Sequence, residues 1–236
     1  SHFENAPSVN RQRIAELEAT TARKGNRKVS LEVSGHVNQA VMYWDDGFED
    51  NAYIVTNDSG RTRFRFTGKA KINSDLEAGY LLEIGIRNSR SDRATQATDD
   101  AGDPLDLRHS SWYLKSKTFG QVIVGETEEA TEKITESNLS QTADIANVAD
   151  VEDYFVGFRL RGQNGVVSNR TYGSLFADSD GVQPGEGSRG NFVRYNTPDF
   201  AGFKGSASWG EDDNWGVALR YAGEFGGFRA AAGIGL

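Results

Sequence analysis

Basic side chains recur at almost every second position between residues 61 and 72. Because successive side chains of a β-strand point to opposite faces, this spacing predicts a strand with one basic and one apolar face. A row of guanidinium and ammonium groups attracts anions, either on a solvated sheet or on the wall of a watery passage. The basic positions are Arg61, Arg63, Arg65, Lys69 and Lys71, with Thr67 among them, and the apolar positions are Phe64, Phe66, Gly68, Ala70 and Ile72.

Two further charged sets accompany this strand. Four arginines share the polar alternation of their own predicted strands, so they are predicted to extend the basic wall: Arg159, Arg161, Arg194 and Arg220. The opposite charge gathers in a long insert at residues 127–153 and just before it. Its acidic residues are Glu126, Glu128, Glu129, Glu132, Glu136, Asp144, Asp150, Glu152 and Asp153.

Composition excludes several classes of protein. The chain has 236 residues, a formal net charge of -8 and no cysteine, which argues against a nucleic-acid-binding protein, a disulfide framework and thiolate chemistry. Only three histidines occur, and neither a Gly-x-Ser-x-Gly nor a His-Glu-x-x-His motif is present, so an enzyme is not favoured. The sequence contains no run of about 18 apolar residues, so it predicts no membrane-spanning helix.

The basic wall residues lie on predicted strands, and the alternation along the chain predicts an all-β protein. About eleven strands are expected, of about nine to fifteen residues, and about nine to eleven residues suffice for a tilted strand to cross a bilayer. Short turns alternate with long polar loops, as in a transmembrane antiparallel β-barrel. The expected strands cover residues 29–43, 61–72, 76–87, 108–117, 121–126, 154–163, 166–177, 189–197, 202–210, 214–223 and 227–236.

Three motifs resemble the porins of Gram-negative bacteria. Residues 195–203 (YNTPDFAGF), followed by SASWG at 206–210, resemble the family's short-turn motif, and KVSLEVSG at 28–35 resembles its first strand. The helical stretch within residues 11–24 is similar to the coiled-coil leader of alphaproteobacterial porins. This resemblance implies an N-terminal segment at 1–27 with a short coiled-coil helix and a β-barrel at 28–236.

The resemblance also implies function. It indicates an integral outer-membrane protein, a homotrimer of barrels of about sixteen strands each, that contacts lipid and lipopolysaccharide and passes small hydrophilic solutes and ions. The insert at 127–153 takes the place of the loop that folds into the pore as a constriction. Its acidic side chains would then oppose the basic wall across a narrow eyelet. Short-turn aromatics would form a girdle at the membrane–water interface: Phe200, Phe203, Phe225 and Phe228.

Several alternatives stay open on the sequence. An outer-membrane barrel enzyme would need its histidine near one rim, and a soluble carbohydrate-binding β-sandwich would purify without detergent. No cofactor is expected, although the aspartates at 99, 100, 103 and 106 raise the alternative of a structural calcium site. An odd number of strands and a chain ending at Leu236 suggest a barrel incomplete at its C-terminus. The ion preference, the solute and the pore diameter are not predicted.

Overall fold

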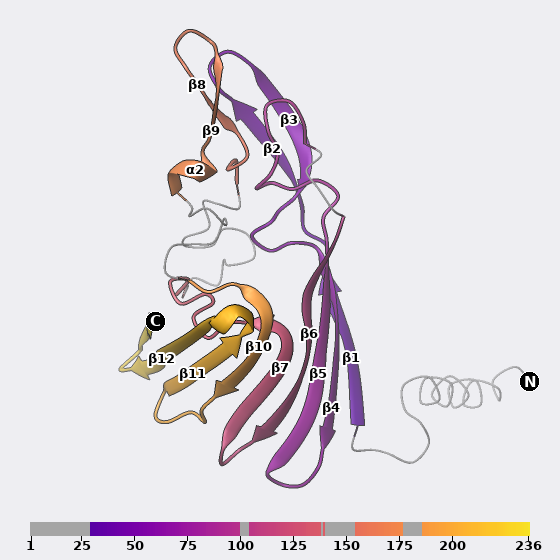
Figure 1. Cartoon of the computed structure of the whole chain (residues 1–236), viewed down its shortest axis with the longest axis vertical. Coiled ribbons are helices and arrows are strands. Elements are labelled where there is room, and N and C mark those ends of the chain that lie inside the picture. Colours follow the sequence, from indigo (N-terminus) through magenta and orange to yellow (C-terminus); the bar gives the residue numbers. More distant parts are fainter. Residues whose placement is uncertain (1–28, 100–103, 138, 140–153, 177–185) are drawn as a thin grey trace, which may run out of the picture.

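A curved antiparallel sheet dominates the computed structural model, which describes residues 29–99, 104–137, 139, 154–176 and 186–236 (Figure 1). Nine strands form it, each hydrogen-bonded to the next along the sheet. In spatial order they are β1 (Val29–His36), β4 (Arg63–Lys71), β5 (Leu76–Ile86), β6 (Leu105–Ser116), β7 (Gly120–Glu128), β10 (Arg189–Asn196), β11 (Phe203–Gly210), β12 (Trp215–Phe225) and β13 (Phe228–Gly235).

The strand register confirms the two faces that alternation predicts. Arg65 pairs with Glu83, and Phe66 pairs with Leu82, so polar lies beside polar and apolar beside apolar across β4 and β5. The apolar face is largely exposed, whereas the largest fully buried side chain among the described residues is Glu83, on the polar face. This inverts the arrangement of a soluble sheet and suits a sheet whose outer face contacts lipid. None of the described helices is long and apolar enough to cross a membrane.

The sheet is open among the described residues. Strands β1 and β13 are its two edges, and the closed barrel of about sixteen strands that the resemblance implies is not present in this part of the chain. The all-β antiparallel class is confirmed. The N-terminal segment at 1–27, with its predicted coiled-coil helix, lies outside the described residues.

Loop lengths divide between the two ends of the sheet. At one end, short turns join β4 to β5, β6 to β7, β10 to β11 and β12 to β13. At the other end lie the long connections, which contain the hairpins β2–β3 (Gln39–Asp45 and Asp50–Thr56) and β8–β9 (Arg159–Arg161 and Val167–Thr171) and the short helix α2 (Gly173–Phe176). Figure 1 shows both hairpins above the sheet, at the end opposite the short turns. The predicted segregation of loop lengths is therefore confirmed with one exception, because β11 and β12 are joined at the long-loop end by the short turn Glu211–Asp213.

Two predictions about strands are wrong. Residues 29–43 do not form one strand, because the chain leaves the sheet after His36; there the Asn38 backbone N–H donates to the Thr62 hydroxyl at 2.9 Å, and β2 begins. Residues 154–163 and 166–177 are not strands of the wall, because β8 and β9 pair only with each other. Apolar alternation identified β-structure there but not the sheet to which it belongs.

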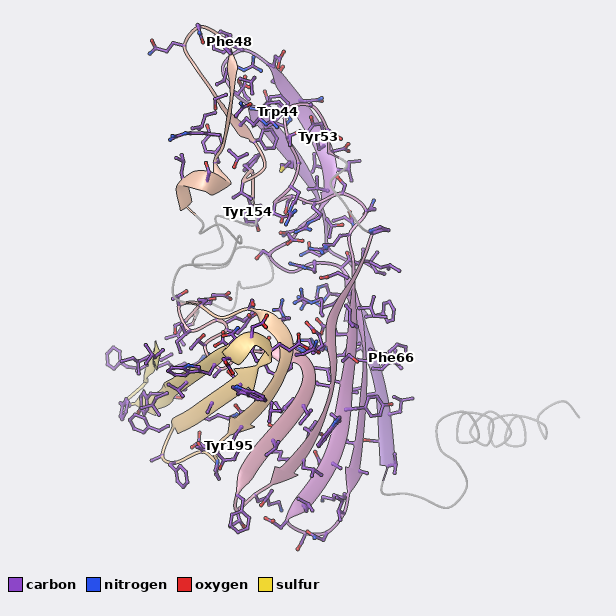
Figure 2. All side chains as sticks on the ribbon, viewed as in Figure 1. Trp44, Phe48, Tyr53, Phe66, Tyr154 and Tyr195 are labelled. Carbon is purple, nitrogen blue, oxygen red and sulfur yellow. The ribbon has the colours of Figure 1, made fainter. Side chains whose placement is uncertain are left out.

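The hairpins outside the main sheet share a small hydrophobic core. Trp44 packs edge-on against Phe158 with ring centroids 5.2 Å apart, and Met42, Tyr53, Val55 and Ala94 complete the cluster. Figure 2 shows Trp44 and Tyr53 on the hairpin β2–β3. Arg161 bonds Asp46 at 2.8 Å across the two hairpins. Three connections distant in sequence therefore meet in one compact cap beyond the long-loop end of the sheet.

Candidate functional site

Glu83 on β5 gathers three arginines on the polar face. Its carboxylate accepts from Arg65 Nε at 2.5 Å and from Arg108 Nε at 2.7 Å, and Arg63 Nη1 lies 3.4 Å away. The side chain of Glu83 has no exposed surface. One carboxylate cannot neutralise three guanidinium groups, so this group carries a net positive charge even though each arginine has a partner.

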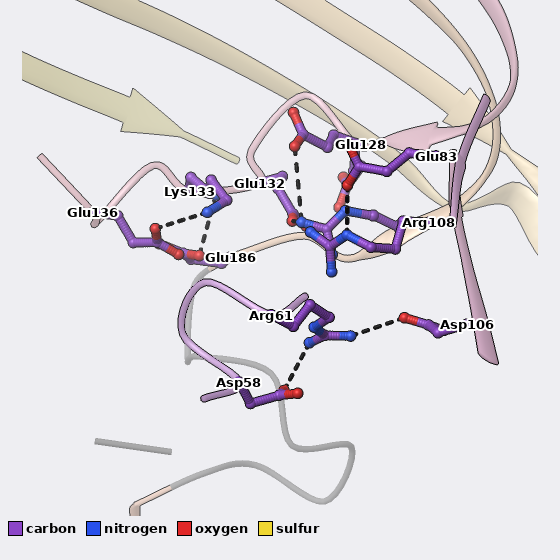
Figure 3. A network of polar contacts seen from close by, with 12 residues as sticks. Asp58, Arg61, Glu83, Asp106, Arg108, Glu128, Glu132, Lys133, Glu136 and Glu186 are labelled. Atoms are coloured by element: carbon purple, nitrogen blue, oxygen red, sulfur yellow. Dashed lines mark hydrogen bonds and ion pairs between the residues drawn. The ribbon is translucent and has the colours of Figure 1, made fainter. Parts of the chain in front are cut away.

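A second charged network lies where the sheet meets the long loops. Arg61 bridges Asp58 and Asp106 at 2.8 Å each, as Figure 3 shows, and Arg87 contacts the same two aspartates at 3.7 and 3.4 Å. Arg90 pairs with Asp92 at 2.5 Å. The predicted wall residues Arg61, Arg63 and Arg65 are therefore paired with carboxylates of β5, of β6 and of the loop before β4.

Residues 129–137, named here the docked segment, lie against the polar face of β10 to β12. Arg194 on β10 donates to the carbonyl oxygens of Glu128 and Glu129 at 3.2 Å each. Arg220 on β12 donates to the carbonyl oxygens of Ala130 and Glu132, at 2.9 and 2.7 Å. These contacts are to the backbone, so they fix the path of the segment independently of its side chains.

Further contacts hold the docked segment from both sides. The Ala130 N–H donates to the Ser208 hydroxyl of β11 at 2.9 Å. Glu186, on the returning part of the same connection, accepts from the backbone N–H groups of Lys133 and Thr135 at 3.1 and 2.8 Å. A glycine makes room on β12: an added Cβ at Gly216 would lie 2.1 Å from a carboxylate oxygen of Glu129.

The acidic residues of the insert divide into three groups. Glu126 and Glu128 belong to strand β7, so placing them in the loop was wrong. Glu129, Glu132 and Glu136 lie on the docked segment, and Asp144 lies outside the described residues, as do residues 150, 152 and 153. Glu132 pairs with Arg189 at 2.6 Å and Glu136 with Lys133 at 3.2 Å. The described acids thus contact cations other than Arg61, Arg63 and Arg65.

The other predicted site residues are also placed by the fold. Arg63, Arg65 and Lys69 lie on the polar face of β4, and Arg194 lies on the same face of the sheet. Arg159 and Arg161 lie on β8 in the cap, so the predicted strand position in the wall is wrong for both. The four predicted girdle aromatics lie at the short-turn end with exposed side chains: Phe200, Phe203, Phe225 and Phe228.

Metal binding finds no support among the described side chains. No group of three His, Cys, Asp or Glu residues in this part of the chain is arranged to hold an ion. Asp106 is instead paired with Arg61 and Arg87. Residues 100 and 103 of the aspartate-rich loop lie outside the described ranges.

Sequence reasoning missed several partners in this site. Alternation places Glu83 on the polar face, but it does not reveal that Arg63, Arg65 and Arg108 converge on it. Arg189 and Arg220 were also not singled out as contacts of the docked segment. Both are arginines on strands that face the long insert. This pattern identifies contact residues only once the strand register is known.

Burial changes the acidity of the docked segment. It raises the pKa of Glu132 to about 7, from a usual value of 4.5, although Arg189 acts in the opposite direction. Burial also raises the pKa of Glu129. Because the docked state favours the protonated form of Glu132, the stabilisation from this proton is complete below about pH 4.5 and is lost as the pH rises through 7.

A pH-dependent stability is therefore expected. The thermal unfolding midpoint of the full-length protein in detergent should fall more between pH 5 and pH 8 than that of the Glu132→Gln variant. Glutamine mimics the neutral carboxyl and does not titrate. Glu136→Gln, on the same segment, serves as the control and should keep the wild-type response. Identical pH responses of wild type and Glu132→Gln would contradict this assignment.

An antiparallel sheet with an exposed apolar face, a buried charged face and a long connection docked on that face defines the class of outer-membrane channel proteins. Residues 14–235 match the family model of the Gram-negative porins, and the chain belongs to that family. It is therefore an outer-membrane protein, and the soluble β-sandwich alternative is wrong. The family is one of channels rather than of enzymes. No curated protein sequence matches the chain.

Two solved structures are similar to parts of this chain. OmpF of Salmonella typhi, in complex with daunomycin, shares 16% sequence identity over 88% of this chain and 54% of that chain, with a TM-score of 0.47. A loop L8 deletion mutant of OmpT, an outer-membrane protein of Vibrio cholerae, shares 16% identity over 88% and 53%, with a TM-score of 0.49. The chain thus spans about half the length of both structures, and the family assignment rests on the family match.

Proposed function

We propose that the complete protein forms a passive, water-filled channel for small hydrophilic solutes and ions. The docking of residues 129–137 on the charged face of the sheet carries this proposal. A loop held by Arg194 and Arg220 against that face would narrow a lumen lined by the same face. Passage by diffusion requires no nucleotide, metal or cofactor.

In this proposal, the charges around the eyelet are not arranged as one basic wall opposite one acidic wall. Arg61, Arg63 and Arg65 already have carboxylate partners in the wall and its neighbouring loops. The acids of the docked segment face Arg189 and Lys133. The field across the pore then comes from the surplus charge of each group, chiefly the positive surplus around Glu83, and fields of this kind set ion preference.

The proposed assembly is a homotrimer that contacts lipid and lipopolysaccharide through its apolar face. Exposed aromatic and branched side chains cover that face, among them Trp112, Leu114, Val193 and Trp209. The phenylalanines at the short turns would lie at the membrane–water boundary. Each subunit would contribute its own pore.

The first test is single-channel recording of the full-length protein in a planar lipid bilayer. We expect stable open steps in groups of three, with a zero-current potential set by the salt gradient. Arg61→Glu should shift that potential toward cation preference, because it reverses one lumenal charge. Well-folded protein that never conducts would refute the channel and would favour a plugged barrel or an enzyme.

A further inference from the structure

Several cations of the polar face make no ion pair in the described structure, among them Lys204 on β11 and Arg229 on β13. Three others are lysines that lie close together on β4 and β6. Lys69 and Lys71 on β4 and Lys115 on β6 have exposed side chains, and in the described part of the chain none of them makes an ion pair or side-chain hydrogen bond. These three residues are named here the lysine triad. Arg61, Arg63 and Arg108, farther along the same face, each bond a carboxylate.

The register places the lysine triad on the face that carries the docked segment. Lys69 pairs with Gly79, Gly79 with Tyr113, and Tyr113 with Ile123, which pairs with Arg194. Paired residues of neighbouring strands share a face, so Lys69 and Arg194 point to the same side. The triad therefore lies on the lumenal side of the proposed channel, on its short-turn half.

The carboxylate nearest the triad in the register leaves its charge surplus intact. Glu77 pairs with Lys71 on one side and with Lys115 on the other. Its carboxylate accepts from the Tyr113 hydroxyl at 2.9 Å and forms an ion pair with neither lysine. Three ammonium groups around one carboxylate have a net positive charge, and the outer lysines are on strands roughly 10 Å apart.

We propose that the lysine triad is a specificity-determining anion site of the channel, on the short-turn side of the docked segment. This inference rests on the proposed channel function. Ammonium groups are compact, strongly hydrated point charges, so the site selects by charge rather than by shape. It takes small hydrated anions as a class, such as chloride, inorganic phosphate and small carboxylates.

The site also makes the pore electrically asymmetric. Free cations lie on the short-turn half, whereas the half toward the long loops carries a paired arginine–carboxylate network. Anions accumulate at the lysine end, so current carried by anions depends on the direction of the applied voltage. The current–voltage curve of a single orientation is expected to be curved rather than straight.

The test compares two triple variants of the full-length protein in planar bilayers under a gradient of potassium chloride near 0.1 M. Lys69→Gln/Lys71→Gln/Lys115→Gln should lower the chloride-to-potassium permeability ratio by at least about three-fold and straighten the current–voltage curve. The control Arg93→Gln/Arg159→Gln/Arg170→Gln removes the same charge from the long-loop end and should change the ratio by less than about 1.5-fold. All three control residues lie outside the nine-stranded sheet.

The outcomes separate this inference from the proposed function. If wild type conducts and the lysine variant keeps its permeability ratio, the lysine triad is not the anion site, while the channel stands. Equal shifts in both triple variants would show a general effect of net charge and would also overturn the site. A silent wild type refutes the channel itself. Adding inorganic phosphate should reduce chloride current in wild type and in the control more than in the lysine variant.

Discussion

Replacing Glu83 with alanine is expected to lower the free energy of unfolding by about 3 kcal/mol or more. Glu83 is fully buried, and Arg63, Arg65 and Arg108 converge on its carboxylate. Removing it leaves three guanidinium groups close together without the charge that holds them. Equilibrium unfolding of the full-length protein in detergent with guanidinium chloride measures the loss.

A matched carboxylate lies on the same face of the same strand. Glu77 accepts one hydrogen bond, from Tyr113, and has no ion pair in the described structure. Its replacement by alanine should cost about 1 kcal/mol, as for a single hydrogen bond. Glu83→Gln keeps the shape and isolates the charge; in folded channels it should raise anion preference. If Glu83→Ala and Glu77→Ala lose equal stability, the convergence on Glu83 contributes nothing.

The second large effect is expected from freeing the docked segment. The double variant Arg194→Ala/Arg220→Ala removes four hydrogen bonds to the carbonyl oxygens of residues 128, 129, 130 and 132. A hydrogen bond from a charged donor contributes about 1.5–3 kcal/mol. The ratio of docked to displaced segments should therefore fall by at least about 100-fold. Single-channel conductance should increase, and the open-channel current should become noisier.

Arg229→Ala provides the control for this variant. Arg229 lies on β13 beside the β12–β13 turn, pairs in register with Glu224 and is exposed. The Arg229→Ala variant removes one arginine charge, and Arg229 makes no contact with the docked segment in the described structure. Its conductance should match the wild type. Unchanged conductance in the double variant would show that residues 129–137 do not limit the pore.

These two predictions concern different parts of one charged surface. Around Glu83, the arginines stabilise the wall and retain a positive surplus. Around Arg194 and Arg220, the guanidinium groups bind backbone and position a loop. Composition shows only that arginines are present, and their partners decide whether they hold structure, hold a loop or remain available to a solute.

Strand alternation was sufficient to predict much of the wall. Residues 61–72 and 76–87 were assigned with the correct faces because their period of two is strict. Residues 154–177 were misplaced because a short exposed hairpin carries the same alternation as a wall strand. Periodicity reports the local conformation and the two faces, but it does not report which strand is the neighbour.

The sequence by itself determined the antiparallel β-class, the two-faced strands, the division into short turns and long loops, and the resemblance to Gram-negative porins. Only the tertiary structure decided which charges meet. Glu83 pairs with arginines 18, 20 and 25 positions away, and Arg220 donates to a carbonyl 90 positions away. Such pairings depend on the register between strands and on the path of a long loop, which local preferences do not specify. The lysine triad depends on the fold for the same reason: no carboxylate of the described residues lies within ion-pairing distance of its three ammonium groups.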